Sequence, residues 1–326
     1  MQKLTFILAV FLFFAACTHD PAKQAEAHGL QLVTEANPEW QYENLRLFPV
    51  LADAGLTAAN EPLRHFHTLA EAMQTEGFRI TERKQFGREE AWYSGLTVQN
   101  RSQDTIFILS GDVITGGNQD RVFAHHEVIL PASVKNAEVF CVERGRSFYY
   151  DSTASETEKK VAAFKGYYNV ASPEVRRAVQ GSGDQGKVWA AVAKVTLANN
   201  AGSSTEAYAG LEQGNADKSK RDACLRFFQG KLIDQPNVVG MVAVCGEDII
   251  GVDIFGHPDL FQRQYNALLH GYVAELALKS KGASASEKAA LDAFATVSAH
   301  AAPGVKDSKQ AGKFVYDGRW MHLFRK

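Results

Sequence analysis

Between Thr105 and Arg146, the hydrophobic and polar positions follow the pattern of an antiparallel β meander. Three apolar runs, rich in β-branched and aromatic residues, are separated by turns marked with glycine and proline. If these strands run alternately up, down and up, three polar clusters meet at one end of the sheet. The clusters are Asp112 after the first strand, residues 116–121 before the second and residues 143–146 after the third. Because neighbouring strands lie about 4.8 Å apart, the clusters would line a patch roughly 10–15 Å across.

The rest of the chain alternates between strand-like and helical patterns. Predicted strands cover residues 44–51, 78–82, 91–100, 238–245 and 249–255, with a closing Asp-Gly hairpin over 314–323. Predicted helices cover residues 68–76, 185–197, 222–229, 258–276 and 284–298, and another begins at Pro173. These elements predict an α+β fold: an antiparallel sheet meander with C-terminal hairpins and packed helices. The first-half strands need the second-half hairpins to complete a sheet, so we expect a single intertwined domain over residues 41–326.

A glycine-rich run at residues 181–186 formally matches the G-x-G-x-x-G motif of dinucleotide-binding proteins. That motif needs a preceding strand, which places the pyrophosphate at a strand-to-helix turn. A predicted helix precedes the run here. We therefore interpret it as a joint between two helices.

The N-terminus has the pattern of a targeting segment. Lys3 is followed by an apolar run from Leu4 to Ala16, which is too short to span a bilayer as a helix. The run ends in residues 14–17, Phe-Ala-Ala-Cys, which resemble a bacterial lipobox except that Phe14 stands where Leu is usual. In such signals the cysteine is acylated and becomes the mature N-terminus. We therefore predict a signal peptide over residues 1–16 and lipidation at Cys17. An ordinary cleaved signal with an incidental cysteine is the alternative.

Residues after Cys17 are polar and lack apolar periodicity, so residues 17–40 are predicted to be a flexible tether. The packed body is expected to start near Leu30 or Trp40. Thr18, rather than Asp, follows the cysteine, and by the usual enterobacterial sorting tendency this favours the outer membrane over the inner one. The predicted location is the bacterial cell envelope, outside the cytoplasm, with the membrane as a partner through the lipid.

Composition narrows the partner classes. The net charge is −2 and the chain has no basic stripe, so a nucleic-acid partner, which needs clustered phosphate contacts, is not expected.

Three cysteines remain after Cys17, namely Cys141, Cys224 and Cys245, and they permit one disulfide with one thiol or three buried thiols. We favour buried thiols because Cys141 and Cys245 lie within apolar strands. No C-x-x-C spacing supports redox chemistry or structural zinc.

The central motifs resemble those of a protein family. Residues 111–121 and 141–146 are similar to the ADP-ribosylglycohydrolase- and rhodanese-phosphatase-associated protein domain, a family of unknown function. Asp112 stands where the family usually has Glu, and Ser147 where an aromatic residue is common. Further matching positions extend from roughly Glu43 to the end: Asn44, Leu45, Phe48, Pro49, Gln185, Val188, Trp189, residues 251–255, Asp317, Gly318 and His322. The family's name records gene neighbours that handle ADP-ribose, so the resemblance implies a link to nucleotide-derived or phosphorylated metabolites. It supplies no mechanism.

The candidate site consists of residue types suited to a small anion. Arginine forks bind carboxylate or phosphate, and a Gly-Gly turn can cradle an anion with backbone N–H groups. The candidate ligand-binding residues are Gly116, Gly117, Asn118, Gln119, Arg121, Arg144, Arg146 and Gln185. Asp112, Glu143 and Asp253 are the candidate acids and bases. The alternative is an internal arginine–carboxylate network that joins strand ends without any ligand.

Histidines and nucleophiles give weaker signals. His65 with His67, or His125 with His126, could supply two ligands of a metal site. Their spacing assigns no third or fourth ligand, so we predict no metal site. No cofactor is identified, and there is no G-x-S-x-G motif for nucleophilic catalysis.

Taken together, these patterns lead us to expect an envelope-anchored lipoprotein with a binding or catalytic site for a small anionic ligand. The alternative is a non-enzymatic interaction module of the cell envelope.

Overall fold

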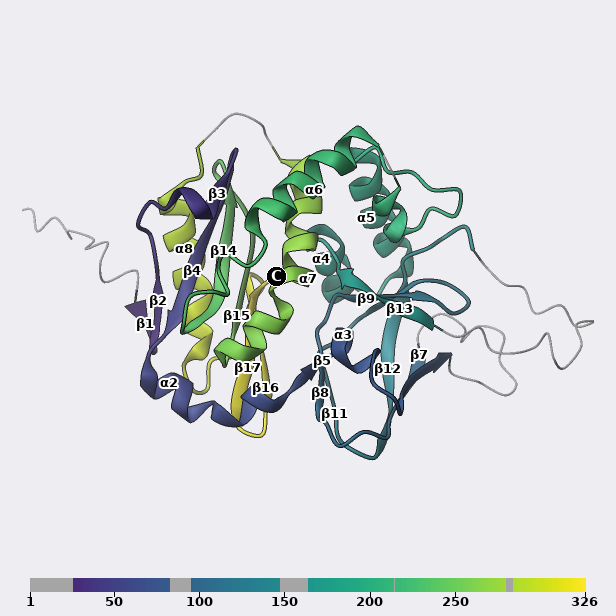
Figure 1. Cartoon of the computed structure of the whole chain (residues 1–326), viewed down its shortest axis with the longest axis horizontal. Coiled ribbons are helices and arrows are strands. Elements are labelled where there is room, and N and C mark those ends of the chain that lie inside the picture. The colour runs from purple at the N-terminus through teal and green to yellow at the C-terminus, as the bar shows by residue number, and fades with distance from the viewer. Residues whose placement is uncertain (1–25, 83–94, 147–163, 214, 280–283) are drawn as a thin grey trace, which may run out of the picture.

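The computed structural model describes residues 26–82, 95–146, 164–213, 215–279 and 284–326. Its antiparallel sheets and packed helices confirm the α+β class. Two sheets lie side by side, and helix α7 (Pro258–Glu275) lies between them (Figure 1). The predicted signal peptide and Cys17 lie outside the described residues. No helix in the described ranges has the length and apolar character needed to cross a bilayer.

The first sheet combines both ends of the sequence. Its order is β1-β2-β4-β14-β15-β17-β16, and β3 pairs with β4. The strands are β1 (Glu26–Ala27), β2 (Leu30–Leu32), β3 (Gln41–Tyr42), β4 (Leu45–Ala52), β14 (Val238–Cys245), β15 (Asp248–Phe255), β16 (Ala311–Tyr316) and β17 (Arg319–Arg325). The missing N–H of Pro49 predicted an interruption at this residue, but β4 continues through it, and the Pro49 carbonyl accepts a bond from the Val33 N–H at 2.9 Å. Leu30 and Leu32 are buried, so the packed body includes the earlier of the two predicted starting points.

The second sheet differs from the predicted meander. Its order is β13-β9-β10-β12-β7-β6, and a separate three-stranded sheet has the order β11-β8-β5. The strands are β5 (His67–Thr68), β6 (Phe78–Glu82), β7 (Gly95–Asn100), β8 (Ile106–Ile108), β9 (Asp112–Gly116), β10 (Arg121–Phe123), β11 (Glu127–Ile129), β12 (Ser133–Cys141) and β13 (Phe164–Val170). The run expected as the first meander strand is thus β8, which belongs to the small sheet.

A tight turn explains this difference. Gly111 has a φ of +101°, a backbone conformation that favours glycine, and it lets the chain leave β8 and enter β9 within three residues. Asp112 locks the turn, because its Oδ2 accepts the backbone N–H of Leu109 at 2.8 Å. Residues 113–115, which lie in none of the three predicted meander strands, therefore belong to a strand that pairs with β10.

The helices begin largely where capping residues predict. They are α2 (Ala54–Ala59), α3 (Leu69–Ala72), α4 (Pro173–Ser182), α5 (Gln185–Ala198), α6 (Ala216–Phe228), α7 and α8 (Glu287–Ser298). The capping box of Thr68 and Glu71 is present, and residues 181–186 form the predicted joint, with Gly183 at a φ of +57° between α4 and α5. Helix α8 is capped by Ser286 instead of Ser284. The three cysteines of the body are buried thiols.

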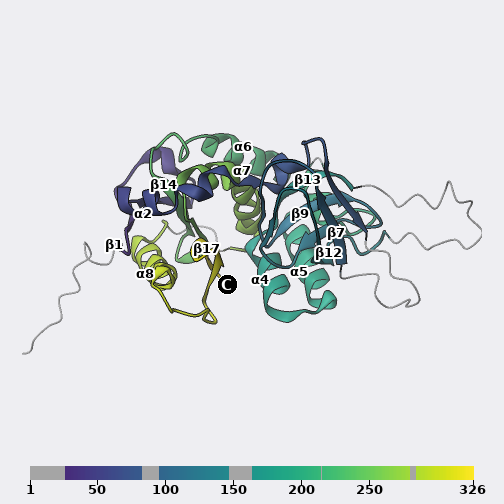
Figure 2. The same ribbon diagram turned by 90° about the horizontal axis from the view of Figure 1, so that it is seen from below.

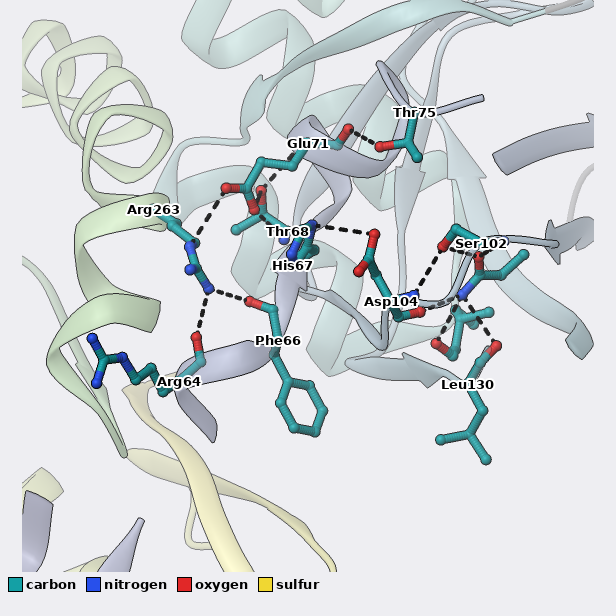
Figure 3. Close-up of polar contacts among 12 residues, drawn as sticks. Arg64, Phe66, His67, Thr68, Glu71, Thr75, Ser102, Asp104, Leu130 and Arg263 are labelled. Atoms are coloured by element: carbon teal, nitrogen blue, oxygen red, sulfur yellow. Dashed lines mark hydrogen bonds and ion pairs between the residues drawn. The ribbon is translucent and has the colours of Figure 1, made fainter. Parts of the chain in front are cut away.

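Helix α7 joins the two sheets. Its apolar residues pack against β14 and β15 of the first sheet and against β13 of the second. Arg263 of α7 also donates to the carbonyls of Arg64 and Phe66, at 2.8 and 2.7 Å, on the segment that crosses from one sheet to the other (Figure 3). The next residue, His67, lies 3.7 Å from Asp104 (Figure 3). These contacts fix the relative placement of the sheets, and one of the two polar clusters described below lies between them.

Candidate functional site

The turn between β9 and β10 meets the end of β12, as predicted. Arg146 donates through Nε to Glu143 at 2.7 Å, through Nη1 to the carbonyl of Gly117 at 2.9 Å and through Nη2 to Asp120 at 2.9 Å. Gln119 donates to the carbonyl of Glu143 at 2.9 Å. We call Gly116, Gly117, Asp120, Glu143 and Arg146 the turn cluster.

Internal carboxylates occupy the N–H groups expected to cradle an anion. The N–H of Gly116 donates to Asp120 at 2.9 Å, and that of Asn118 donates to Glu82 at 3.2 Å. Burial raises the pKa of Asp120 to about 6. Burial opposes ionisation of Glu143 too, but hydrogen bonds from Arg146, Thr205 and the Asp120 N–H, together with the charge of Arg146, outweigh it and lower the pKa of Glu143. The turn cluster is therefore arranged to bind its own side chains.

Arg121 also has internal partners. Its side chain is buried, donates to both oxygens of Glu82 at 3.2 Å, and contacts Cys141 Sγ. Gln185 spans the N–H and carbonyl of Cys141 with two 2.8 Å bonds, and thus continues the hydrogen bonding at the end of β12. Arg144 points away, with its exposed guanidinium over the Trp189 ring. The structure therefore brings Arg121, Glu143 and Arg146 to one end of the sheet but separates Arg144 from them.

Asp112 does not join the turn cluster, which corrects the sequence prediction. It begins β9, whereas Gly116 ends it, and four residues of strand place these positions roughly 13 Å apart. The buried carboxyl accepts a 2.9 Å bond from the Tyr167 hydroxyl as well as the bond from Leu109. Burial raises the pKa of Asp112 to about 7.

Asp253 lies in a different cluster, between the sheets. Arg176 of α4 binds both of its carboxylate oxygens, at 2.8 and 2.7 Å. The Tyr272 hydroxyl of α7 donates to Oδ2, and His322 Nε2 of β17 lies 2.9 Å from Oδ1. Although burial alone would raise the pKa of Asp253, Arg176 holds it well below its usual range. Three hydrogen bonds, two from Arg176 and one from Tyr272, thus engage both oxygens of this carboxylate.

A second histidine extends this network into the other half of the molecule. His126, between β10 and β11, has its Nε2 at 2.8 Å from His322 Nδ1. Its ring stacks with Phe107 and Phe314. Burial lowers the pKa of both imidazoles, so both are neutral near pH 7. We call Arg176, Asp253, Tyr272, His322 and His126 the inter-sheet cluster.

A cleft opens beside this cluster, where α4 faces β15 and the C-terminal strand. Arg176, Arg177, Gln180, Asp253 and Arg325 supply its polar lining, and the enclosed space within it is about 10 Å³. Figure 1 and Figure 2 both place the C-terminus between the first sheet and α4. We call this the arginine cleft. Three guanidinium groups around one concave surface are suited to an anion.

The arginines of the cleft differ in how they are paired. Arg176 is held by Asp253, and Arg177 is shared between Glu174 at 3.1 Å and Glu275 at 3.0 Å. Arg325 forms no ion pair with any described residue, and its guanidinium donates a 3.5 Å hydrogen bond to the Ile249 carbonyl. Burial, and then the charge of Arg177, lower the pKa of Arg325, whereas the charge of Asp248 opposes this shift. The lining of the cleft holds three arginines and one carboxylate, so it is net positive.

A second cleft, with a similar enclosed space of about 10 Å³, lies between β13, α6 and α7. Its lining holds Lys218 and Arg221 together with the carboxylates Glu212 and Asp222, which lie 3.6 and 2.8 Å from Lys218. Its charges are thus balanced. We consider the arginine cleft the better anion site.

Sequence reasoning identified Asp253 but missed its partners. A carboxylate in an apolar strand row does indicate a buried cation, because buried charges are paired. Nothing in the spacing indicates that the cation is Arg176, 77 residues earlier, or that His126 and His322 meet across 196 residues. Arg325 was not singled out because a terminal arginine is usually solvated.

Comparison with known proteins places the chain in a family. The family model described as the ARG and Rhodanese-Phosphatase-superfamily-associated Protein domain, ARPP-1, matches residues 34–324. The chain belongs to this family. The match confirms the resemblance based on the central motifs, and it includes the turn cluster and the inter-sheet cluster. No curated protein and no solved structure matches the chain.

Proposed function

We propose that this protein is an envelope-anchored lipoprotein that binds a small anionic ligand in the arginine cleft. The observation that carries the proposal is Arg325, a solvent-exposed cation near Arg177 that lacks an ion-pair partner among the described residues. An anion between these two guanidinium groups would remove their mutual repulsion. It would also replace water with charge-assisted hydrogen bonds, which are among the strongest in proteins.

The cleft's size and charge indicate the ligand class. The enclosed space of about 10 Å³ is roughly the room for one water-sized group, so the ligand inserts a single charged group and the rest of it lies outside the cleft. Arginine forks match the planar edge of a carboxylate or two oxygens of a phosphate. Family membership favours phosphate, because the family's name links it to the handling of ADP-ribose. We infer a phosphate group of a nucleotide or sugar phosphate.

The arrangement supports binding more than catalysis. Asp253 is the carboxylate in the lining of the cleft, yet Arg176 binds both of its oxygens and Tyr272 donates to one of them. A general base needs a free acceptor within reach of the proton that it removes. The turn cluster would act as a structural network that joins strand ends.

Ligand binding is tested by calorimetry and thermal shift with ADP-ribose, AMP, ribose 5-phosphate and sulfate. Arg325→Gln keeps polarity but removes the fork, and we expect at least a tenfold loss of affinity, the equivalent of one charge-assisted hydrogen bond. Arg319→Gln is the matched control, because Arg319 lies on the same hairpin but pairs with Asp317. Equal affinity in wild type and Arg325→Gln, or no binding of any probe, would refute the proposal.

Anchoring rests on the sequence alone, because Cys17 lies outside the described residues. Cys17→Ala should move the protein from the membrane fraction to the soluble extracytoplasmic fraction. Metabolic labelling with a palmitate analogue should mark the wild type only. Unchanged partitioning without label would show that a different feature, or none, attaches the protein. Sucrose-gradient separation would decide between the outer membrane, which we favour, and the inner one.

The alternative, an interaction module of the envelope, predicts a contiguous exposed apolar patch. Within the described ranges the exposed large hydrophobic residues are Leu130, Val134, Leu197, Val305 and Val315. Leu130 and Val134 lie close in sequence, whereas the others come from separate segments. Scattered residues of this kind are normal on soluble proteins. We therefore favour anion binding.

A further inference from the structure

The two imidazoles of the inter-sheet cluster lead directly to the arginine cleft. His126 Nε2 lies 2.8 Å from His322 Nδ1, and His322 Nε2 lies 2.9 Å from Asp253 Oδ1. That same oxygen accepts the Nη2 bond of Arg176, at 2.7 Å. The imidazole pair and a cleft arginine therefore share one carboxylate oxygen. Any change of charge on the pair therefore changes the electrostatic potential at Arg176.

We propose that the His126–His322 pair is a proton-binding site that regulates the anion affinity of the arginine cleft. This inference rests on the proposed function. In the neutral pair one N–H lies between the two rings, with His126 as donor if His322 directs its other N–H at Asp253. Uptake of one proton converts the pair to an imidazole–imidazolium unit whose positive charge lies next to Asp253.

The groups around the pair explain why it is neutral without ligand. Arg176 of α4 faces it across Asp253 of β15, and His125 adjoins His126 on the same connection. Asp253 favours protonation, whereas Arg176 and His125 oppose it. Tyr272 of α7 approaches through its bond to Asp253. Aromatic rings, among them Phe255 at 4.4 Å from His322, exclude water and oppose a charge further.

A bound anion reverses this balance. It offsets the positive charge of Arg176 and its neighbours, so the pair accepts a proton more readily. By linkage the protonated pair must then bind the anion more tightly by the same factor. In the proposed arrangement the imidazole pair and the anion lie on opposite sides of Arg176. The interaction between their charges is screened, so we expect protonation of the pair to change the anion affinity about three- to tenfold.

The test uses two probes that do not titrate between pH 5.5 and 7.5: sulfate and ADP-ribose. The wild type should bind each three- to tenfold more tightly at pH 5.5 than at pH 7.5, at constant ionic strength. His322→Gln keeps a donor toward Asp253 but takes up no proton, so its affinity should not depend on pH. His126→Phe fits among Phe107, Phe314 and Phe324 and serves as a second variant if His322→Gln does not fold.

His125→Gln is the matched control, because His125 is adjacent in sequence but exposed and paired with Glu138 at 3.2 Å. It should retain the pH dependence of the wild type. Binding that is independent of pH, or a pH dependence that survives His322→Gln and His126→Phe, would overturn the inference alone. If neither probe binds at either pH, the proposed function is wrong and the inference falls with it.

Discussion

Replacing Asp253 with Asn tests the electrostatic structure of the inter-sheet cluster. The side chains have nearly the same shape, so the change removes a charge and leaves Arg176 buried without its ionised partner. Breaking a buried pair in this way costs about 3–5 kcal/mol. Asp112 offsets part of this cost, because it is the next carboxyl whose charge favours that of Arg176. We expect Asp253→Asn to lower the free energy of unfolding by about 3 kcal/mol at pH 7.5.

Urea unfolding followed by tryptophan fluorescence measures this loss, with thermal unfolding as a second readout. With an unfolding entropy of about 2.1 cal/mol/K per residue, 3 kcal/mol corresponds to a shift in Tm of roughly 5 °C. Asp248→Asn is the control, since Asp248 begins the same strand but is exposed, and it should change stability by less than about 0.5 kcal/mol. The pKa of Asp253 is lowered in the fold. Its stabilisation is therefore present above the unfolded pKa of about 3.9 and is lost as the pH falls below it.

A double-mutant cycle measures the interaction energy between Arg176 and Asp253, apart from the contacts that each makes with other residues. Arg176→Met alone should be as costly as Asp253→Asn, because it leaves the carboxylate buried without its main partner. The double variant should lose much less than the sum, since replacing both members of a buried pair is often nearly neutral. Additive losses would refute the reasoning. So would an Asp253→Asn variant within about 1 kcal/mol of wild type.

Three further outcomes follow from individual contacts. The folded pKa of Asp112, raised to about 7, means that the native state binds a proton more tightly than the unfolded chain, so this group weakens the fold as the pH rises from about 4 to 7. Asp112→Asn should therefore gain Tm relative to wild type between pH 5 and pH 8, and parallel Tm curves would contradict this. Gly251→Ala should cost roughly 1–3 kcal/mol, because its Cβ would lie 2.5 Å from the Tyr272 ring; a urea midpoint equal to wild type would exclude that packing. Gln185→Ala should cost about 1–3 kcal/mol by leaving the backbone of Cys141 unpaired, and hydrogen exchange should speed up at the Cys141 amide, whereas unchanged exchange would argue against the bond.

Most of the secondary structure could be predicted from local sequence patterns. The Thr68–Glu71 capping box, the residue 181–186 joint and the hairpin of β14 and β15 each depend on neighbours a few residues apart, so the sequence displays them directly. The error in the central meander has the same origin. A turn at Gly111 and a separate three-stranded sheet place β8 and β9 in different sheets, and no local pattern distinguishes that from one sheet.

The candidate site was harder to predict because it depends on distant partners. Arg121, Glu143 and Arg146 were correctly grouped, since one hairpin and one strand end bring them together. Their internal pairing was the alternative that the sequence left open, but the partners Asp120 and Glu82, the latter from β6, were not identified. The arginine cleft joins α4 to β15 and β17, and its charge balance follows only from knowing which carboxylate each arginine contacts.

The most direct test of anion binding in the arginine cleft is a crystal soaked in selenate, with the anion located by its anomalous scattering. Our account predicts a peak between the guanidinium groups of Arg177 and Arg325, and its loss in Arg325→Gln crystals soaked in the same way. A peak at the turn cluster, beside Gly116 and Arg146, with none in the cleft would contradict it.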